Sequence, residues 1–314
     1  MTQQESLPSP ANTRIDRVGF IGLGEMGTPI AAHVLRRHAS LKVYNRTTPR
    51  MRPLLDQGAT GCSSPRKLGE QTELILLCLF DAEATESVLF GPDGVMTAAR
   101  PGQLIVDLST AHPGRTRSIA KRAHELGVRW VDAPVSGGPQ GALAGTLAVM
   151  AGGAEDDIRR IKPVLASFAS QVTHVGPTGC GQIAKACNQM INFGNAAAIA
   201  EAMNLAARLG LDPRCLPQAL AGGFADSALL RHIGPKMANG TVRGNSAMTM
   251  KDMEIALDLG RSANSAMPVT ELIGSIFRQL LAQGRTQDGI GGIARFYTDD
   301  SFAEEFGRLV SKRR

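Results

Sequence analysis

The sequence changes character near residue 177, and this change narrows the choice of folds. Up to that point, short runs rich in Leu, Val and Ile alternate with stretches of helical periodicity. The runs cover 17–21, 41–45, 74–79, 104–108, 128–131, 147–150 and 172–175. Strands that alternate with helices form a parallel sheet covered by helices. We therefore expect an α/β domain with a doubly wound sheet over residues 16–177.

The second half of the chain has no comparable strand signal. An Ala-rich stretch without proline runs from Gln182 to Leu209, longer than a typical helix. Shorter helical stretches follow, separated by Pro213, Pro217, Pro235 and Pro268. We expect an all-helical domain over residues 178–314, entered through one long helix. The first fifteen residues, rich in Ser, Pro and Gln, are predicted to form a disordered tail, 1–15.

Length and charge limit the classes of partner. At about 150 residues per domain, the 314 residues make two domains, and 43% hydrophobic with 20% charged residues is typical of a globular protein. The net charge of +6 could attract nucleic acid or a smaller anion. Only thirteen residues are aromatic (10 Phe, 2 Tyr and 1 Trp), too few for base-stacking platforms. We expect a small anionic ligand and no nucleic acid.

Metal and membrane signals are absent from the sequence. The five cysteines form no CxxC pair and the six histidines no HxxxH pair, so we expect no metal site and a reducing compartment. The strongest apolar run, 74–80, is far shorter than the about 20 residues that cross a bilayer. The start of the chain has no basic and apolar signal segment. These features predict a cytoplasmic protein with no membrane partner.

A glycine motif follows the first apolar run directly. It consists of Gly22, Leu23, Gly24, Glu25, Met26 and Gly27, and an amphipathic stretch follows it. In a GxGxxG turn the first glycine permits the tight turn, the second admits a pyrophosphate, and the third packs the helix against the strand. A glycine-rich turn of an unrelated α/β protein is the alternative. The strand before and the helix after the motif favour a Rossmann-type dinucleotide site.

The end of the second apolar run indicates which dinucleotide binds. The run ends at Asn45, and Arg46 and Thr47 follow it. NAD-binding proteins carry an acidic residue here, which binds the ribose 2′-hydroxyl. A carboxylate would repel a 2′-phosphate, whereas an arginine pairs with it in a charge-assisted contact. The alternative is that Arg46 is only a solvated turn residue. We predict NADP(H) as the cofactor.

Further loops follow the other predicted strands on the same edge of the sheet, where ligands of such folds bind. Leu79 and Phe80 follow one strand and are expected to contact the dinucleotide, and Thr110 follows another strand at the same edge. The loop 132–138 ends in Ser136, Gly137 and Gly138. Its successive amides and its hydroxyl suit an anion such as a carboxylate, although a flexible loop would have the same composition.

One face of the predicted long helix carries an unusual set of polar residues. Lys185, Asn188, Asn192 and Asn195 recur at steps of three and four among small and apolar neighbours. A lysine in a partly dehydrated site has a lowered pKa and can exchange a proton near neutrality. His112, close after Thr110, is a rival proton donor. The alternative for Lys185 and Asn188 is a structural role that holds the two domains together.

Five ordered segments resemble the β-hydroxyacid dehydrogenase family. They are the turn at 22–27, Ser109-Thr110, 132–138, 176–188 and Lys251-Asp252, within a resemblance that extends from Arg17 to Tyr297. The family includes 3-hydroxyisobutyrate dehydrogenases and tartronate semialdehyde (2-hydroxy-3-oxopropionate) reductases.

The resemblance implies roles for individual residues. Lys185 would be the catalytic acid and base, Ser136 with Gly137 and Gly138 would bind the substrate carboxylate, and Asn188 would position the substrate. Thr110 and Lys251 would contact the cofactor near its nicotinamide, and Asp252 would have an orienting role. The resemblance also implies a homodimer or homotetramer, with 178–314 as the domain for substrate binding and dimerisation.

The sequence departs from the family pattern in the helical half. Gly244 stands where the family carries phenylalanine, so we expect an enlarged pocket there, and 222–227 and 288–292 also differ. We interpret the chain as an NADP-dependent oxidoreductase that reduces a short semialdehyde acid, best tartronate semialdehyde, to its 3-hydroxy acid. A 3-hydroxyisobutyrate or other 3-hydroxyacid dehydrogenase is the first alternative. An imine reductase or a non-enzymatic NADPH sensor is the second alternative. The retained Lys185 and 132–138 loop argue against an imine reductase, and the intact polar face that begins at Lys185 argues against a sensor.

Overall fold

The computed structural model describes residues 15–38 and 40–298. The chain divides into two compact units, with the boundary between Lys185 and Ala186. Residues 1–14 of the expected tail lie outside the described part of the chain. Ile15, the last residue of that expected tail, is instead buried in the core of the first unit, so the tail prediction is wrong for this residue. None of the described helices is long and apolar enough to span a membrane.

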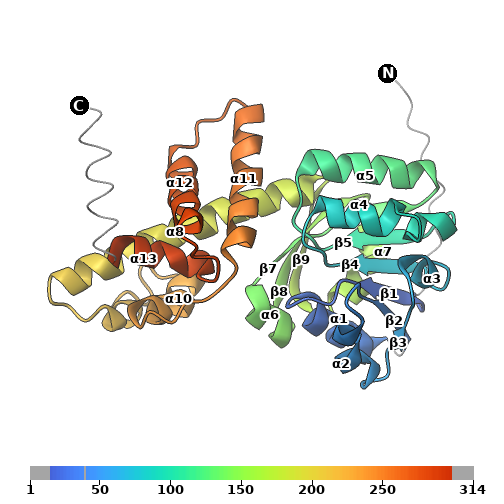
Figure 1. The fold of residues 1–314 in the computed structure, drawn as a ribbon, viewed down its shortest axis with the longest axis horizontal. Helices are drawn as coiled ribbons and strands as arrows, with labels where there is room; N and C mark the ends of the chain where they lie inside the picture. Colours follow the sequence, from blue (N-terminus) through green and yellow to red (C-terminus); the bar gives the residue numbers. More distant parts are fainter. Residues whose placement is uncertain (1–14, 39, 299–314) are drawn as a thin grey trace. The chain divides into compact units, whose positions relative to one another are not determined.

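The first unit is built on one sheet of nine strands within the described residues (Figure 1). The strands are β1 (Val18–Ile21), β2 (Leu41–Tyr44), β3 (Thr60–Gly61), β4 (Leu74–Leu77), β5 (Leu104–Asp107), β6 (Arg129–Asp132), β7 (Val135–Ser136), β8 (Leu147–Gly153) and β9 (Ala169–Gly176). Their order is β3-β2-β1-β4-β5-β6-β8-β7, with β9 beside β8. In this order, each strand from β3 through β2, β1, β4 and β5 to β6 is parallel to its neighbour. The expected Rossmann-type sheet is confirmed.

Helices cover both faces of this sheet. They are α1 (Gly27–Arg37), α2 (Arg52–Leu55), α3 (Pro65–Gly69), α4 (Ala82–Phe90), α5 (Pro113–Glu125), α6 (Gly138–Ala144) and α7 (Glu155–Leu165), with 3-10 turns η1 (Thr48–Met51) and η2 (Val95–Ala98). Leu74 and Leu76 of β4 pack into one core with residues of α1 and α7, and Ile75 and Leu77 into the opposite core with residues of α4 and α5. Because the side chains of a strand alternate between its two faces and both faces are covered, β4 is apolar at every position.

Part of the sheet differs from the parallel arrangement expected from sequence. β8 runs antiparallel to β6 and to β7. β7 consists of only Val135 and Ser136, and it lies in the loop where the sequence predicts substrate binding. Residues 131–136 thus run in one direction along β8, so pairing with β8 ties the loop after β6 to the sheet.

The second unit is helical, as expected. α8 (Cys180–Arg208) begins in the first unit and continues into the second, followed by η3 (Pro213–Cys215), α9 (Leu216–Ala219), α10 (Ala228–Ala238), α11 (Ser246–Ser262), α12 (Pro268–Ala282), η4 (Gly289–Gly291) and α13 (Gly292–Thr298). Its core centres on Phe193 of α8 and Phe277 of α12, whose rings meet edge to face at 6.0 Å between centroids. Ser227 and Asn245 cap the N-termini of α10 and α11. These helices thus form a core of their own.

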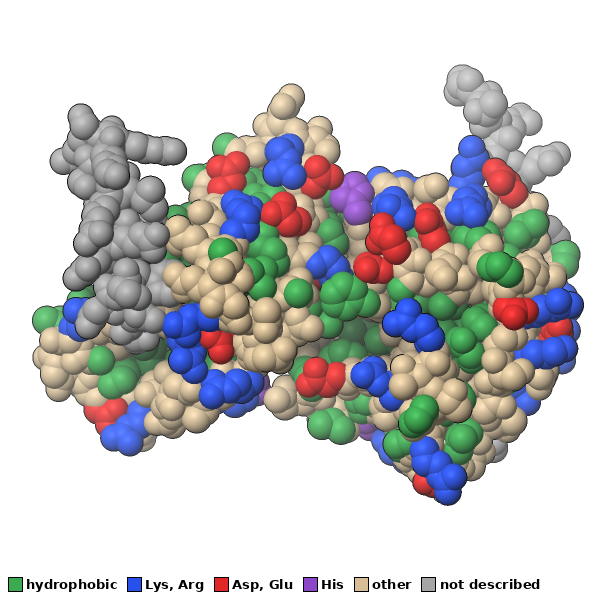
Figure 2. All heavy atoms as spheres, in the orientation of Figure 1, with side chains coloured by type: hydrophobic (Ala, Val, Ile, Leu, Met, Phe, Trp, Pro, Cys, Tyr) green, Lys and Arg blue, Asp and Glu red, His purple; other side chains and the backbone are tan. Residues whose placement is uncertain are grey.

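Charged side chains of opposite sign pair on the surface of the first unit. Arg115 pairs with both Glu83 and Glu86 at 3.0 Å, and Arg159 pairs with Glu155 and Asp156. Figure 2 shows Lys and Arg interspersed with Asp and Glu on the face that it presents. Exposed pairs of this kind contribute little stability each. The expectation that nucleic acid is not a partner stays a prediction.

Candidate active site

The glycine turn between β1 and α1 has the shape of a phosphate cradle. Gly22 has a φ of +99°, and a side chain there would collide with the carbonyl oxygen of Cys78. A side chain at Gly27 would collide with the carbonyl oxygen of Gly22. A Cβ at Gly24, in contrast, would meet no atom within 4 Å. The fold therefore requires glycine at positions 22 and 27. The space beside Gly24 is open, which fits the approach of a pyrophosphate.

The neighbouring residues of the turn leave the start of α1 available to an anion. Met26 precedes α1 without capping it through its side chain, and the first turn of α1 carries no acidic residue. Glu25 is exposed, whereas Leu23 is buried in the core. Free helix N–H groups and the helix dipole favour a phosphate at such an end. The turn therefore fits the diphosphate of a dinucleotide.

The end of β2 is fastened to this turn by Asn45. Its Oδ1 accepts a hydrogen bond from the Leu23 N–H at 2.9 Å, and its Nδ2 donates to the Thr47 carbonyl at 3.0 Å. The polar atoms of Asn45 thus bind the main chain. Arg46 and Thr47 are exposed beside it. Of the three residues predicted to read the ribose, Asn45 shapes the loop, and Arg46 and Thr47 present their side chains outward.

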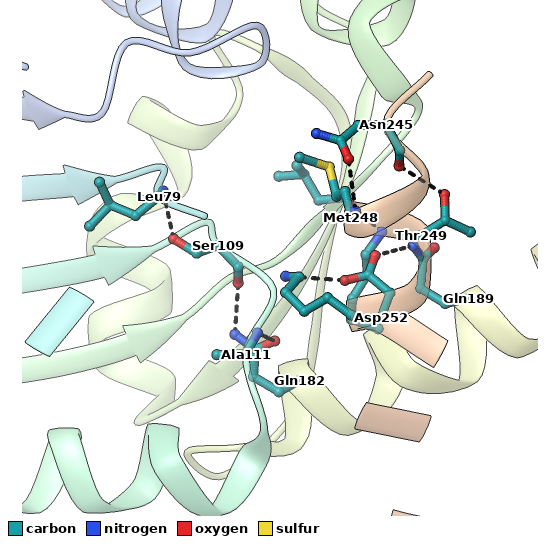
Figure 3. A network of polar contacts seen from close by, with 12 residues as sticks. Leu79, Ser109, Ala111, Gln182, Gln189, Asn245, Met248, Thr249 and Asp252 are labelled. Carbon is teal, nitrogen blue, oxygen red and sulfur yellow. Dashed lines mark hydrogen bonds and ion pairs between the residues drawn. The ribbon is translucent and has the colours of Figure 1, made fainter. Parts of the chain in front are cut away.

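The loops after β4 and β5 are joined through Ser109 (Figure 3). Its Oγ accepts a hydrogen bond from the Leu79 N–H at 2.8 Å, and its own N–H donates to Asp107 at 3.0 Å. Phe80 is 46% exposed, and Thr110 is half-buried. The structure thus brings the Leu79–Phe80 loop and Thr110 together at the edge of the sheet where the sequence places the cofactor.

The N-terminus of α8 is fastened to the start of the predicted substrate loop. Asp132, at the end of β6, accepts hydrogen bonds from the N–H of Gly179 at 2.7 Å and of Gln182 at 3.1 Å. The carboxylate is fully buried, and this burial raises its pKa above the ordinary value although the bonds from the main chain oppose the shift. Side chains at Gly152 or Gly181 would press on the Asp132 carboxylate. The close packing places α8 beside the 132–138 loop.

Lys185 lies in this arrangement where its ammonium reaches the substrate loop. Its side chain is mostly buried, and its Nζ donates a hydrogen bond to the carbonyl oxygen of Val135 at 2.9 Å. Ser136 follows directly and is half-buried, while Gly137 and Gly138 are exposed with φ of +130° and +62°. The structure therefore brings together Lys185 and the three residues predicted to bind a carboxylate. An ammonium beside accessible amides and a hydroxyl can bind an anion and supply a proton.

A second polar group lies within the helical unit. Asn188 donates to the Gln189 side-chain oxygen at 2.9 Å, and Gln189 donates to Asp252 at 2.6 Å. Lys251 pairs with Asp252 at 3.2 Å. Asn188 and Lys251, both predicted as site residues, thus belong to one chain of contacts through buried Gln189 and Asp252. Figure 3 shows the bond from Gln189 to Asp252. Gln189 was missed by sequence reasoning, although it follows Lys185 at a helical step of four.

Gly244, where the sequence predicts an enlarged pocket, lies against a second departure from the family pattern, and the enlarged pocket stays a prediction. Gly244 pairs with Asp288 in a parallel bridge, and a Cβ at Gly244 would lie 3.2 Å from the Cα of Gly289. Gly289 in turn has a φ of +53°, and a side chain there would press on the main chain of Gly244. The two departures therefore contact each other, and main chain occupies the space beside Gly244.

Two known family models match the chain, and together they cover most of its length. Residues 17–176 match the NAD binding domain of 6-phosphogluconate dehydrogenase, and residues 179–297 match the NAD-binding domain of NADP-dependent 3-hydroxyisobutyrate dehydrogenase. The chain belongs to the β-hydroxyacid dehydrogenase family. It is therefore a hydroxyacid dehydrogenase of the oxidoreductase class with an NAD(P)-binding domain.

Individual proteins match the chain over nearly its whole length. The 2-hydroxy-3-oxopropionate reductase of Escherichia coli K12 is 37% identical, over 86% of this chain and 93% of that protein. The structure of 3-hydroxyisobutyrate dehydrogenase from Salmonella typhimurium superposes with a TM-score of 0.81 at 27% identity, over 89% of this chain and 99% of that one. The structure of Psf3 in complex with NADP+ and 2-OPP has a TM-score of 0.80 at 26% identity, over 90% and 99%.

Proposed function

We propose that this β-hydroxyacid dehydrogenase reduces a short semialdehyde acid to the 3-hydroxy acid with NADPH, and that 2-hydroxy-3-oxopropionate (tartronate semialdehyde) is its substrate. The observation that carries the proposal is the bond from Lys185 to Val135, because it holds an ammonium next to the Ser136 loop. The 37% identity to a 2-hydroxy-3-oxopropionate reductase supports this substrate over the hydroxyisobutyrate alternative.

The chain's own groups account for binding and proton transfer. The Ser136 hydroxyl and the amides of Gly137 and Gly138 hold the substrate carboxylate. Lys185 donates a proton to the carbonyl oxygen as negative charge develops there, and the Val135 carbonyl restricts the position of the ammonium. When bound, the dinucleotide supplies the hydride. Orientation of the two reactants in one site contributes much of the rate.

The preference for NADP(H) rests on the end of β2. Arg46 and Thr47 are exposed where the ribose-reading residue is expected, and the ordered position of Asn45 holds this loop against the glycine turn. An arginine there attracts a 2′-phosphate. The NADP+ complex of Psf3 supports the same choice.

Steady-state reduction assays test the reaction. The purified protein is assayed for loss of NADPH absorbance with 2-hydroxy-3-oxopropionate, methylmalonate semialdehyde, succinic semialdehyde and glyoxylate. We expect the fastest turnover with the first, and a loss of kcat of about 100-fold or more in Lys185→Ala. Near wild-type kcat in Lys185→Ala would reject the role of the lysine. NADPH binding without turnover of any of these acids would reject the reaction.

Cofactor choice is tested by one variant and its control. Arg46→Ala should raise KM for NADPH about tenfold or more and leave KM for NADH unchanged, because only NADPH carries the 2′-phosphate. Arg52→Ala removes a neighbouring exposed arginine that pairs with Asp56, and it should change neither value. An unchanged ratio of kcat/KM for the two cofactors in Arg46→Ala would exclude this reading of the loop.

A further inference from the structure

We propose that Gln182 is a positioning residue that holds the Thr110 loop and the helix of Lys185 in one fixed arrangement. The inference rests on the proposed reaction for the role of Lys185. Gln182 lies in the first turn of α8 and is 1% exposed. Its side chain therefore acts on the protein itself, and not on a bound molecule directly.

The side-chain amide of Gln182 brackets Thr110 (Figure 3). Nε2 donates to the carbonyl oxygen of Ser109 at 2.9 Å, and Oε1 accepts from the N–H of Ala111 at 3.0 Å. The two bonds use main-chain groups on either side of Thr110. Because both Ser109 and Ala111 are buried, water cannot easily replace a lost partner. The amide thus fixes the main chain of the loop that is expected to face the nicotinamide.

The same residue is linked to the substrate loop and to the proton donor. The main-chain N–H of Gln182 donates to Asp132, which begins the 132–138 loop. Lys185 follows one helical turn later, on the same face of α8. Ser109, held by Gln182, also binds the Leu79 N–H. Gln182 is therefore the residue at which contacts to the loops after β4, β5 and β6 converge on the helix of Lys185.

Only a group that donates and accepts at once satisfies both neighbours. Leucine has a similar size but leaves the Ser109 carbonyl and the Ala111 N–H unpaired. An ionised glutamate accepts from Ala111 but turns a second oxygen toward the Ser109 carbonyl. A protonated glutamic acid both accepts and donates. Ionisable groups around this position include Asp132, Asp107 and Lys185, and the burial of the site raises the pKa of a carboxyl introduced there.

Three variants test the positioning role: Gln182→Leu, Gln182→Glu and, as a control, Gln171→Glu on the exposed part of β9. We expect Gln182→Leu to lower kcat roughly 10- to 100-fold and KM for substrate to change little. With NADPH deuterated at the transferred position, the isotope effect on kcat should be larger in Gln182→Leu than in wild type. Gln182→Glu should gain activity as pH falls, relative to wild type, because protonation restores the second bond. Gln171→Glu should follow the wild-type pH profile.

A second readout does not depend on turnover. Hydrogen exchange followed by mass spectrometry, with NADPH bound, should show faster exchange in the peptide around Ala111 in Gln182→Leu and unchanged exchange in β1 and β4. An unchanged kcat in Gln182→Leu, or a wild-type pH profile in Gln182→Glu, would overturn the positioning role. If wild type reduces none of the semialdehyde acids, the proposed function fails. In that case, unchanged exchange around Ala111 in Gln182→Leu rejects the positioning role of Gln182, and faster exchange there supports it.

Discussion

In the turn at 22–27, Gly22 is required by the fold and Gly24 is expected to admit the cofactor, and substitution can distinguish these two roles. A Cβ at Gly24 meets nothing within 4 Å, whereas a Cβ at Gly22 collides with the Cys78 carbonyl. We predict that Gly24→Ala keeps the wild-type melting temperature without cofactor but weakens NADPH binding at least tenfold, or about 1.4 kcal/mol. Calorimetry of unfolding and of NADPH binding measures the two quantities. Wild-type affinity in Gly24→Ala would show that the pyrophosphate does not approach there.

The free energy of unfolding lost in Gly22→Ala has two parts, the backbone strain of a residue with positive φ and the collision of the added methyl group. Gly58 has a φ of +98°, almost the same as the +99° of Gly22, but open space surrounds the position of its Cβ. Gly58→Ala should therefore lower the free energy of unfolding by only about 1–2 kcal/mol, the strain of a left-handed alanine. Gly22→Ala should cost clearly more because it adds the collision. Equal losses in chemical denaturation would mean that the turn relaxes around the added methyl group.

At the scale of elements, the junction of β6 and α8 depends on a buried carboxylate. Burial raises the pKa of Asp132 above 3.8, so at pH values between 3.8 and its folded pKa the folded protein binds more protons than the unfolded chain. The free energy of unfolding from this group therefore increases as pH falls through that window. The gain reaches about 1.4 kcal/mol for each unit by which the pKa is raised.

Asp132→Asn removes this titration. The free energy of unfolding of wild type minus that of Asp132→Asn should grow as pH is lowered from 7 toward 4, measured by urea denaturation at each pH. Asp56→Asn, at an exposed position, is the control for removing one negative charge. A difference that is constant with pH, or one that shrinks on acidification, would show that Asp132 is not held at a raised pKa.

The same elements show what sequence reasoning can and cannot reach in the fold. All seven predicted strands exist, because a strand buried on both faces, such as β4, is a continuous apolar run. β3 and β7 have two residues each, too few to show any periodicity. The antiparallel pairing of β8 was also missed, because pairing direction depends on partners distant in sequence.

In the candidate site, residues with distinctive chemistry were identified and their supports were not. Lys185 among asparagines and Ser136 before two glycines stand out in the sequence, and the structure places them beside Val135. Gln182 contacts main-chain groups 71 and 73 positions away. A glutamine within a helix has no signal of its own, so only the fold reveals such a bracket.

At the scale of the whole molecule, the two units have separate cores although α8 runs through their boundary. The core around Phe277 draws its residues from Phe193 to Phe296, and the core around Phe168 from Ile15 to Ala169. Both phenylalanines are fully buried, so replacement by alanine should cost about 3–5 kcal/mol at either site. Because neither core shares a residue with the other, we expect each loss to stay within its unit.

Hydrogen exchange with peptide resolution tests this expectation on the full chain. Phe277→Ala should speed exchange in α11 and α12 and leave β4 and β5 at wild-type rates. Phe168→Ala, the matched variant of the first unit, should show the reverse pattern. Since NADPH is expected to bind the glycine turn, it should slow exchange in the first unit of Phe277→Ala without restoring α12. Equal loss of protection in both units of either variant would mean that the long helix makes the protein unfold as one cooperative body, with the two cores stabilising each other through it.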